Sequence, residues 1–146
     1  MRELYFRAMA RIELMAWSEA RVHAAPIREE VFVAEQGVPA ELEMDEADAE
    51  CLHAVAFDGE RAVATGRLLP DGHIGRMAVL EKARGRGVGS ALLLALMDES
   101  RRRGNREAVL NAQVQAQAFY ERHGYALAGA PYDDAGIPHV EMRRRL

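Results

Sequence analysis

The sequence predicts a single α/β domain, residues 1–146, built on a sheet that mixes parallel and antiparallel strands. Two apolar runs joined by Asp58-Gly59 indicate an antiparallel hairpin in the first half of the chain. The second half alternates strand-like and helix-like patterns, which is typical of β-α-β units. No linker, repeat or low-complexity segment divides the chain, so we expect one core.

The first third of the chain is predicted to contain a strand followed by a helix. Apolar residues alternate from Leu4 to Ala8 and again from Ile12 to Ala16, and we take the second stretch as the first strand. Ser18 is the expected N-cap of the helix, and Pro26 starts or kinks its second half. Residues 36–39, Gln-Gly-Val-Pro, end the helix.

An acidic loop follows this helix. Residues 41–50 hold six Asp or Glu side chains, among them Asp45 and Asp48. Such a run is usually solvated, but beside a pocket it would attract a cationic amine. Both interpretations are open at this point.

The remaining elements follow from apolar patterns and turn residues. Helices are predicted over residues 87–103 and 114–123, because Gly104 and Gly124 are typical C-terminal stops. Strands are predicted at residues 52–57, 62–69, around 77, 108–110, 125–128 and 137–142.

A glycine-rich turn separates the strand around Met77 from the next helix. Residues 84–89 read Arg-Gly-Arg-Gly-Val-Gly. A helix that begins with so little side-chain bulk offers unpaired N–H groups and a partial positive charge to a phosphate or pyrophosphate. The dinucleotide fingerprint fails because Ser90 stands where its third glycine should be, and the triphosphate loop fails because no lysine follows the glycines.

Two motifs carry a resemblance to a known family. Arg84, Gly87 and Gly89 fit the pattern Gln/Arg-x-x-Gly-x-Gly/Ala, which resembles the acetyl-CoA pyrophosphate loop of the GCN5-related N-acetyltransferases (GNAT). About thirty residues later, the chain resembles the second signature of that family. This signature consists of Gln113, Ala116, Phe119, Tyr120, Gly124 and Tyr125.

Further segments look like the bacterial ElaA and YjcF-like branch of the family. They are residues 31–39, His53, residues 64–68 and residues 136–142. The resemblance implies the GNAT acyl-CoA N-acyltransferase fold, a central and mostly antiparallel sheet with helices on both faces. It also implies an acetyl-CoA-dependent N-acetyltransferase.

The resemblance assigns cofactor contacts to both motifs. The backbone of Met77, Ala78 and Val79 would pair with the pantetheine amides, and the Met77 N–H would stabilise the oxygen of the reacting thioester. The pyrophosphate would lie against the residues of the loop, namely Arg84, Gly85, Arg86, Gly87, Val88, Gly89 and Ser90.

The second motif supplies the expected catalytic acid. Tyr120 occupies the position of the usual general acid, which protonates the departing CoA thiolate, and Phe119 fills the aromatic core position beside it. Gln113 replaces the usual Asn, so its contact with pantetheine is an expectation that nearby Asn111 could meet instead.

The general base and the acceptor site stay open in the sequence. Glu35, Gln36, Asp45, His53 and His139 are expected near the acceptor. The base could be any of His53, His139, Glu35, Asp45 and Asp48.

Composition limits the other functions. The formal net charge of −4 argues against nucleic acid as a partner, and no apolar run is long enough to cross a membrane. Cys51 is the only cysteine, so neither an internal disulfide nor a cysteine zinc site is expected, and we predict no metal. No signal peptide is evident, which favours the cytoplasm, and a homodimer is left open.

Direct transfer of acetyl to a primary amine of a small molecule is therefore the leading prediction. Cys51 is the only obvious covalent nucleophile, and we interpret it as a small apolar residue at the start of a buried strand. Two alternatives are a non-catalytic CoA-binding sensor and a protein N-acetyltransferase.

Overall fold

A computed structural model of the chain describes residues 10–146; the Leu4 to Ala8 alternation lies outside these residues. Its sheet has the strand order β1-β2-β3-β4-β5-β8-β6, with β7 paired to β8. Only the β4–β5 pair is parallel, which confirms the predicted mixed, mostly antiparallel sheet. The strands are β1 (Ala10–Ala16), β2 (Leu52–Asp58), β3 (Arg61–Leu68), β4 (His73–Val79), β5 (Glu107–Gln113), β6 (Ala126–Leu127), β7 (Tyr132–Asp134) and β8 (Ile137–Arg145).

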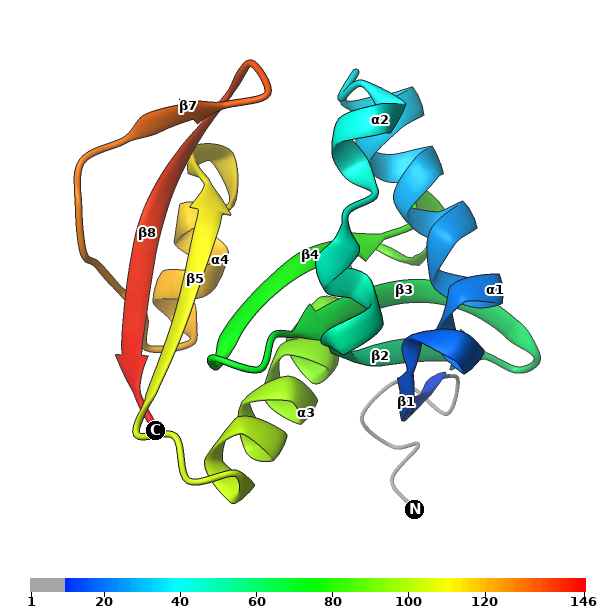
Figure 1. Ribbon diagram of the computed structural model, residues 1–146, viewed down its shortest axis with the longest axis horizontal. Coiled ribbons are helices and arrows are strands. Elements are labelled where there is room, and N and C mark those ends of the chain that lie inside the picture. The colour runs from blue at the N-terminus through cyan, green and yellow to red at the C-terminus, as the bar shows by residue number, and fades with distance from the viewer. Residues whose placement is uncertain (1–9) are drawn as a thin grey trace.

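Two long helices cover opposite faces of the strands β2 to β4 (Figure 1). Helix α1 (Trp17–Arg28) continues as the π-helix η2 (Glu29–Glu35), and together they bury apolar side chains in two small clusters on one face. Helix α3 (Val88–Arg102) buries its apolar stripe in the main core on the other face. The short helices are α2 (Ala40–Glu43), η3 (Glu46–Glu50), η4 (Glu81–Ala83), η5 (Val114–Ala116) and α4 (Gln117–Arg122).

Several predicted boundaries are wrong. Ser18 does not cap α1: the helix begins at Trp17 with Ala16 as N-cap, and no side chain bonds to its first amides. Pro26 lies inside α1, and the widened turns of η2 begin three residues later. The helix predicted at 114–123 divides into η5 and α4, and the strand β7 was not predicted, because its three residues carry no apolar alternation.

The strands β4 and β5 separate along their length. They pair only at His73 with Val109 and at Ile74 with Leu110, and beyond these residues Figure 1 shows them diverging. A bulge in β4 contributes to the separation, because Arg76 and Met77 both lie opposite Gly66 of β3. Arg76 therefore has a φ of 48°, in the left-handed region.

Gly66 gives the bulge the room it needs. A Cβ atom at this position would lie 2.6 Å from Met77 Sδ and 3.0 Å from Leu96 Cδ1. The Met77 side chain can therefore lie across β3 only because Gly66 has no side chain.

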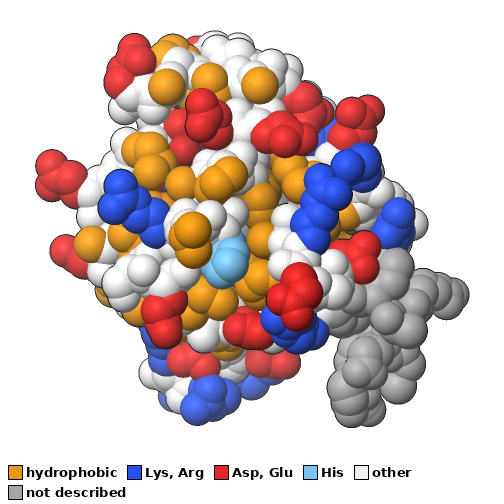
Figure 2. Space-filling view, turned by 90° about the vertical axis from the view of Figure 1, so that its right-hand side faces the viewer, with side chains coloured by type: hydrophobic (Ala, Val, Ile, Leu, Met, Phe, Trp, Pro, Cys, Tyr) orange, Lys and Arg blue, Asp and Glu red, His pale blue; other side chains and the backbone are white. Residues whose placement is uncertain are grey.

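The face at the right of Figure 1 carries acidic, basic and hydrophobic side chains interspersed (Figure 2). Within residues 10–146, no helix is long and apolar enough to span a bilayer.

Candidate active site

A cleft of about 940 Å³ lies where β4 and β5 separate. Pockets that hold small molecules or cofactors usually have volumes of about 300–1,000 Å³. Its walls come from η2, β4, the glycine-rich turn, β5, α4 and the β7–β8 hairpin. Of the predicted site residues, it contains Glu35, Gln36, Met77, Ala78, Val79, Arg84, Gly89, Asn111, Gln113, Phe119, Tyr120 and His139.

The backbone of β4 faces the cleft along one edge. Ala78 pairs with Thr65 of β3 and Val79 pairs with Ala64, so only one edge of β4 is used there. Because β5 no longer pairs beyond Ile74, the other edge presents its N–H and C=O groups to the cleft. An extended molecule with amide groups can bond to such an edge.

The glycine-rich turn leads into α3 with two left-handed glycines. Gly85 has φ 80° and Gly87 has φ 84°, and a Cβ at either position would meet nothing within 4 Å. The first backbone bond of the helix runs from the Ala91 N–H to Gly87 O at 3.0 Å, so the N–H groups of Val88, Gly89 and Ser90 have no intrahelical partner. This arrangement suits an anionic group.

Arg84 lies in this turn but is held by a carboxylate from the opposite wall. Its two Nη atoms donate to Glu35 at 2.6 and 2.9 Å, and its Nε donates to Val79 O at 2.9 Å. The hydrogen bonds from Arg84 lower the pKa of Glu35. Ser90 Oγ bonds to His123 Nε2 at 2.9 Å, and Arg86 lies 3.8 Å from Asp58.

Gln36, next to Glu35, contacts the other wall. Gln113 Nε2 donates to Gln36 Oε1 at 2.8 Å, and Gln36 Nε2 donates to Gln113 Oε1 at 3.3 Å. The end of η2 therefore bridges the cleft in two directions, to the glycine-rich turn through Glu35 and to β5 through Gln36.

Tyr120 lies in the wall that α4 forms. Its side chain is buried among aromatic rings, 5.0 Å from Phe119 and 5.8 Å from Tyr125 between ring centroids. Burial raises the pKa of Tyr120 to about 12, so the phenol keeps its proton at neutral pH.

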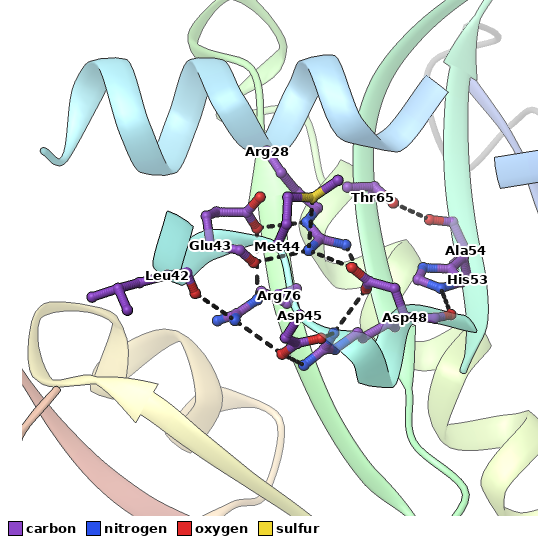
Figure 3. Close-up of polar contacts among 11 residues, drawn as sticks. Arg28, Leu42, Glu43, Met44, Asp45, Asp48, His53, Ala54, Thr65 and Arg76 are labelled. Carbon is purple, nitrogen blue, oxygen red and sulfur yellow. Dashed lines mark hydrogen bonds and ion pairs between the residues drawn. The ribbon is translucent and has the colours of Figure 1, made fainter. Parts of the chain in front are cut away.

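Three carboxylates of the acidic loop are paired with arginines, whereas Glu41, Glu46 and Glu50 are exposed. Figure 3 shows its carboxylates among arginine side chains from α1, β3 and β4. Arg28 donates to Glu43 at 2.6 Å and to Asp48 at 2.8 and 3.0 Å. Arg67 donates to Asp45 at 2.8 and 3.0 Å and to Asp48 at 2.7 Å. We call the six residues the arginine network: Arg28, Arg67, Arg76, Glu43, Asp45 and Asp48.

The network corrects the interpretation of the loop as an acceptor-attracting surface. Its three arginines and three carboxylates carry no net charge. Hydrogen bonds from Arg67 lower the pKa of Asp45 to about 2, and those from Arg28 and Arg67 lower the pKa of Asp48 although burial opposes the shift. Neither Asp45 nor Asp48 lines the cleft, so the structure does not place them as a base or as acceptor contacts.

The two candidate histidines occupy different environments. His53 is buried outside the cleft, packs on Trp17, and bonds to Asp48 O at 2.9 Å, and burial lowers its pKa. His139 lines the cleft, and its Nδ1 lies 2.7 Å from Ile137 O. Because a carbonyl oxygen can only accept, Nδ1 carries the proton and Nε2 is the basic nitrogen.

Arg76 is a cleft residue that sequence reasoning missed. It lies in the middle of an otherwise apolar strand segment, residues 74–79, and this single charge was the available signal. Cys51 is buried outside the cleft, and burial raises the pKa of its thiol, which agrees with a packing role.

Comparisons with known proteins agree with this geometry. The family model described as an acetyltransferase (GNAT) domain matches residues 14–146. The chain is 45% identical over 122 residues to the uncharacterized N-acetyltransferase YjcF of Bacillus subtilis, a match that covers 81% of this chain and 87% of that protein.

Solved structures with the same fold include two of similar size. The crystal structure of Escherichia coli ElaA gives a TM-score of 0.83 at 27% identity, covering 93% of this chain and 99% of that one. An acyl-CoA N-acyltransferase from Pseudomonas aeruginosa gives 0.80 at 29% identity, covering 92% and 99%. The chain belongs to the GNAT family of N-acetyltransferases, and its relatives in that family include YjcF and ElaA.

Proposed function

We propose that the protein transfers an acetyl group from acetyl-CoA directly to the primary amine of a small molecule, with both substrates bound in the cleft. The observation that carries the proposal is the unpaired edge of β4, which faces the buried phenol of Tyr120 across one cleft. An amide-bearing chain can bond to this edge, and a leaving thiolate can take a proton from the phenol.

The residues of the cleft fit CoA. The free N–H groups of Val88, Gly89 and Ser90 would hold the pyrophosphate, with the positive end of the α3 dipole behind them. The β4 edge from Met77 to Val79 would pair with pantetheine. Acetyl-CoA would supply the activated thioester that the reaction consumes, and CoA would leave as the thiol.

Two groups would act on the reacting atoms. The amine nitrogen bonds to the thioester carbon, negative charge develops on the carbonyl oxygen, and the Met77 N–H stabilises it. The carbon–sulfur bond then breaks, and Tyr120 donates its proton to the sulfur. A phenol with a pKa of about 12 reprotonates readily from solvent for the next turnover.

His139 is the group best placed to take the proton from the amine. It lines the cleft and presents Nε2 as a free acceptor, since Nδ1 is committed to Ile137 O. Imidazole changes its charge near neutral pH, as a general base must. Of the five sequence candidates, Glu35 also lines the cleft but is held by Arg84.

A thiol-release assay over a panel of amines, amino sugars and peptides tests the proposal. We expect CoA formation with small primary amines and binding of acetyl-CoA by calorimetry. Acetyl-CoA binding without thiol release from any amine would instead support a sensor, and release only with peptides would support protein acetylation. No binding of acetyl-CoA would overturn the proposal.

A further inference from the structure

Arg76 differs from the other two arginines of the network in how it is held. The hydrogen bonds of Arg28 and Arg67 to the network carboxylates are all 3.0 Å or shorter. Arg76 reaches Asp45 at 3.2 Å, Leu42 O at 3.4 Å and Glu43 at 3.6 Å. Its partners are thus more distant, and both carboxylates already bind another arginine.

The donors of Arg76 are incompletely used. Its Nε is buried without a hydrogen bond, and its Nη1 makes none with the described part of the chain. Burial and the nearby Arg67 charge lower the pKa of Arg76, whereas hydrogen bonds to carboxylates raise those of Arg28 and Arg67 despite burial. Arg76 is therefore held less firmly by carboxylates than Arg28 and Arg67 are.

The position of Arg76 places it beside the reaction. It lines the cleft and directly precedes Met77, whose N–H is expected to hold the thioester oxygen. Its φ of 48° comes from the bulge, and Figure 3 shows its guanidinium at the margin of the network beside Leu42 and Asp45.

The acidic side chains that line the cleft either bind another arginine more closely than they approach Arg76 or are exposed. Glu35 is bound to Arg84, and Glu43 is bound to Arg28. The carboxylates of Asp71 and Asp134 lie at the exposed rim. An anionic group that enters the cleft could accept hydrogen bonds from the Nη atoms of Arg76, of which Nη1 has no partner in the described part of the chain.

We propose that the acceptor is an amine that also carries a carboxylate, and that Arg76 binds this carboxylate while the amine attacks the thioester. The proposal rests on the proposed N-acetyltransferase function and names the class of its acceptor as amino acids or similar amino carboxylates. A guanidinium is suited to a carboxylate because it presents paired N–H donors in one plane.

Matched acceptors test the proposal in thiol-release assays. Each α-, β- or γ-amino acid in the panel is compared with its carboxamide and with the corresponding amine that lacks the carboxyl group. For the wild-type protein we expect kcat/KM to be about tenfold to a hundredfold higher for the acid, the range of a charged hydrogen bond. In Arg76→Met this preference should disappear, and in Arg76→Lys it should be reduced but present.

Two measurements distinguish the acceptor proposal from the proposed N-acetyltransferase function on which it rests. Calorimetric binding of CoA to Arg76→Met should be unchanged, and its circular dichroism should match the wild type, because Arg28 and Arg67 still hold the carboxylates. Thiol release that is equally fast with acids and carboxamides, or an unchanged preference in Arg76→Met, would overturn the acceptor proposal alone. Absence of thiol release with every amine would count against the acetyltransferase function itself.

Discussion

Gln36 and Gln113 exchange hydrogen bonds through their side-chain amides, at 2.8 and 3.3 Å, across the cleft. The two residues are 77 positions apart, one at the end of η2 and the other at the end of β5. Neighbouring Glu35 binds Arg84 of the glycine-rich turn. Two adjacent residues at the end of η2 therefore contact both walls of the cleft. A cofactor that reaches the β4 edge must pass beside these contacts.

Removing the Glu35 charge should therefore strengthen CoA binding. Glu35 holds Arg84 and would also repel the phosphates, so we expect Glu35→Gln to lower the Kd of CoA severalfold in calorimetry at low salt. Glu29→Gln, an exposed position on the same helix, is the matched control and should leave Kd unchanged. A weaker affinity in Glu35→Gln would show that Glu35 orients Arg84 for the cofactor.

Gly87 tests the phosphate site. Gly87→Glu should weaken CoA binding at least tenfold, because the new carboxylate would lie among the amides expected to hold the pyrophosphate. The left-handed φ adds a strain of about 1–2 kcal/mol. Gly104→Glu, at φ 93° beyond the end of α3, has the same strain and charge and should retain CoA affinity. Equal effects of both variants would place the phosphates elsewhere.

The acid role of Tyr120 can be separated from its packing role. We expect Tyr120→Phe to lower kcat about a hundredfold with little change in CoA affinity, because only the proton donor is lost. Tyr125→Phe is the control: its hydroxyl is buried without a hydrogen-bond partner among residues 10–146, so its removal should leave kcat unchanged. Comparable kcat in Tyr120→Phe and the wild type would make water the donor.

The base role of His139 predicts a pH dependence. With a saturating amine, kcat should rise as the pH is raised, because the imidazole must be unprotonated to accept a proton. In His139→Gln the rate should fall about a hundredfold and the rise should move toward the pKa of the free amine. His53→Gln, outside the cleft, should keep the wild-type pH profile if the variant folds. A wild-type profile in His139→Gln would exclude it as the base.

The arginine network should make folding stability sensitive to acid. The folded-state pKa of Asp45 is about 2 and that of Asp48 is also lowered, so the unfolded chain binds more protons between about pH 4 and pH 2. The contribution of Asp45 and Asp48 to the free energy of unfolding, measured in urea, should be constant above this window. It should fall as the pH is lowered through the window.

Asp48→Asn checks the cause. It should cost about 3–5 kcal/mol at neutral pH, because the variant leaves buried Arg28 and Arg67 without a shared carboxylate, and it should flatten the acid dependence. Asp98→Asn, in an exposed ion pair with Arg101, should cost under about 1 kcal/mol. Similar losses in both variants would mean that the network adds nothing beyond surface pairing.

The sequence predicted those features that depend on local pattern. The glycine-rich turn, the Asp58-Gly59 hairpin and the mixed sheet follow from residue type and period, and the structure confirms them. The interpretation of the acidic loop as an acceptor-attracting surface was wrong, because Glu43, Asp45 and Asp48 pair with arginines that lie on three other elements. The tertiary fold determines which charges from distant segments pair. The periodicity of residues along the sequence does not predict such pairs.

The start of α1 was predicted wrongly for a different reason. Ser18 satisfies the N-cap pattern, but the helix begins one residue earlier, directly from β1. The close connection between strand and helix decides this boundary and overrides the local preference of a serine.

The bulge at Arg76 gives the molecule an internal strand edge. Exposed edges of a sheet are usually a hazard, since another chain can add a strand to them and begin aggregation. Here the unpaired stretch of β4 lies inside the molecule, with β5 on one side and the end of η2 above it. One additional residue in β4 thus leaves the unpaired backbone groups in a cleft and not at the outer border of the sheet.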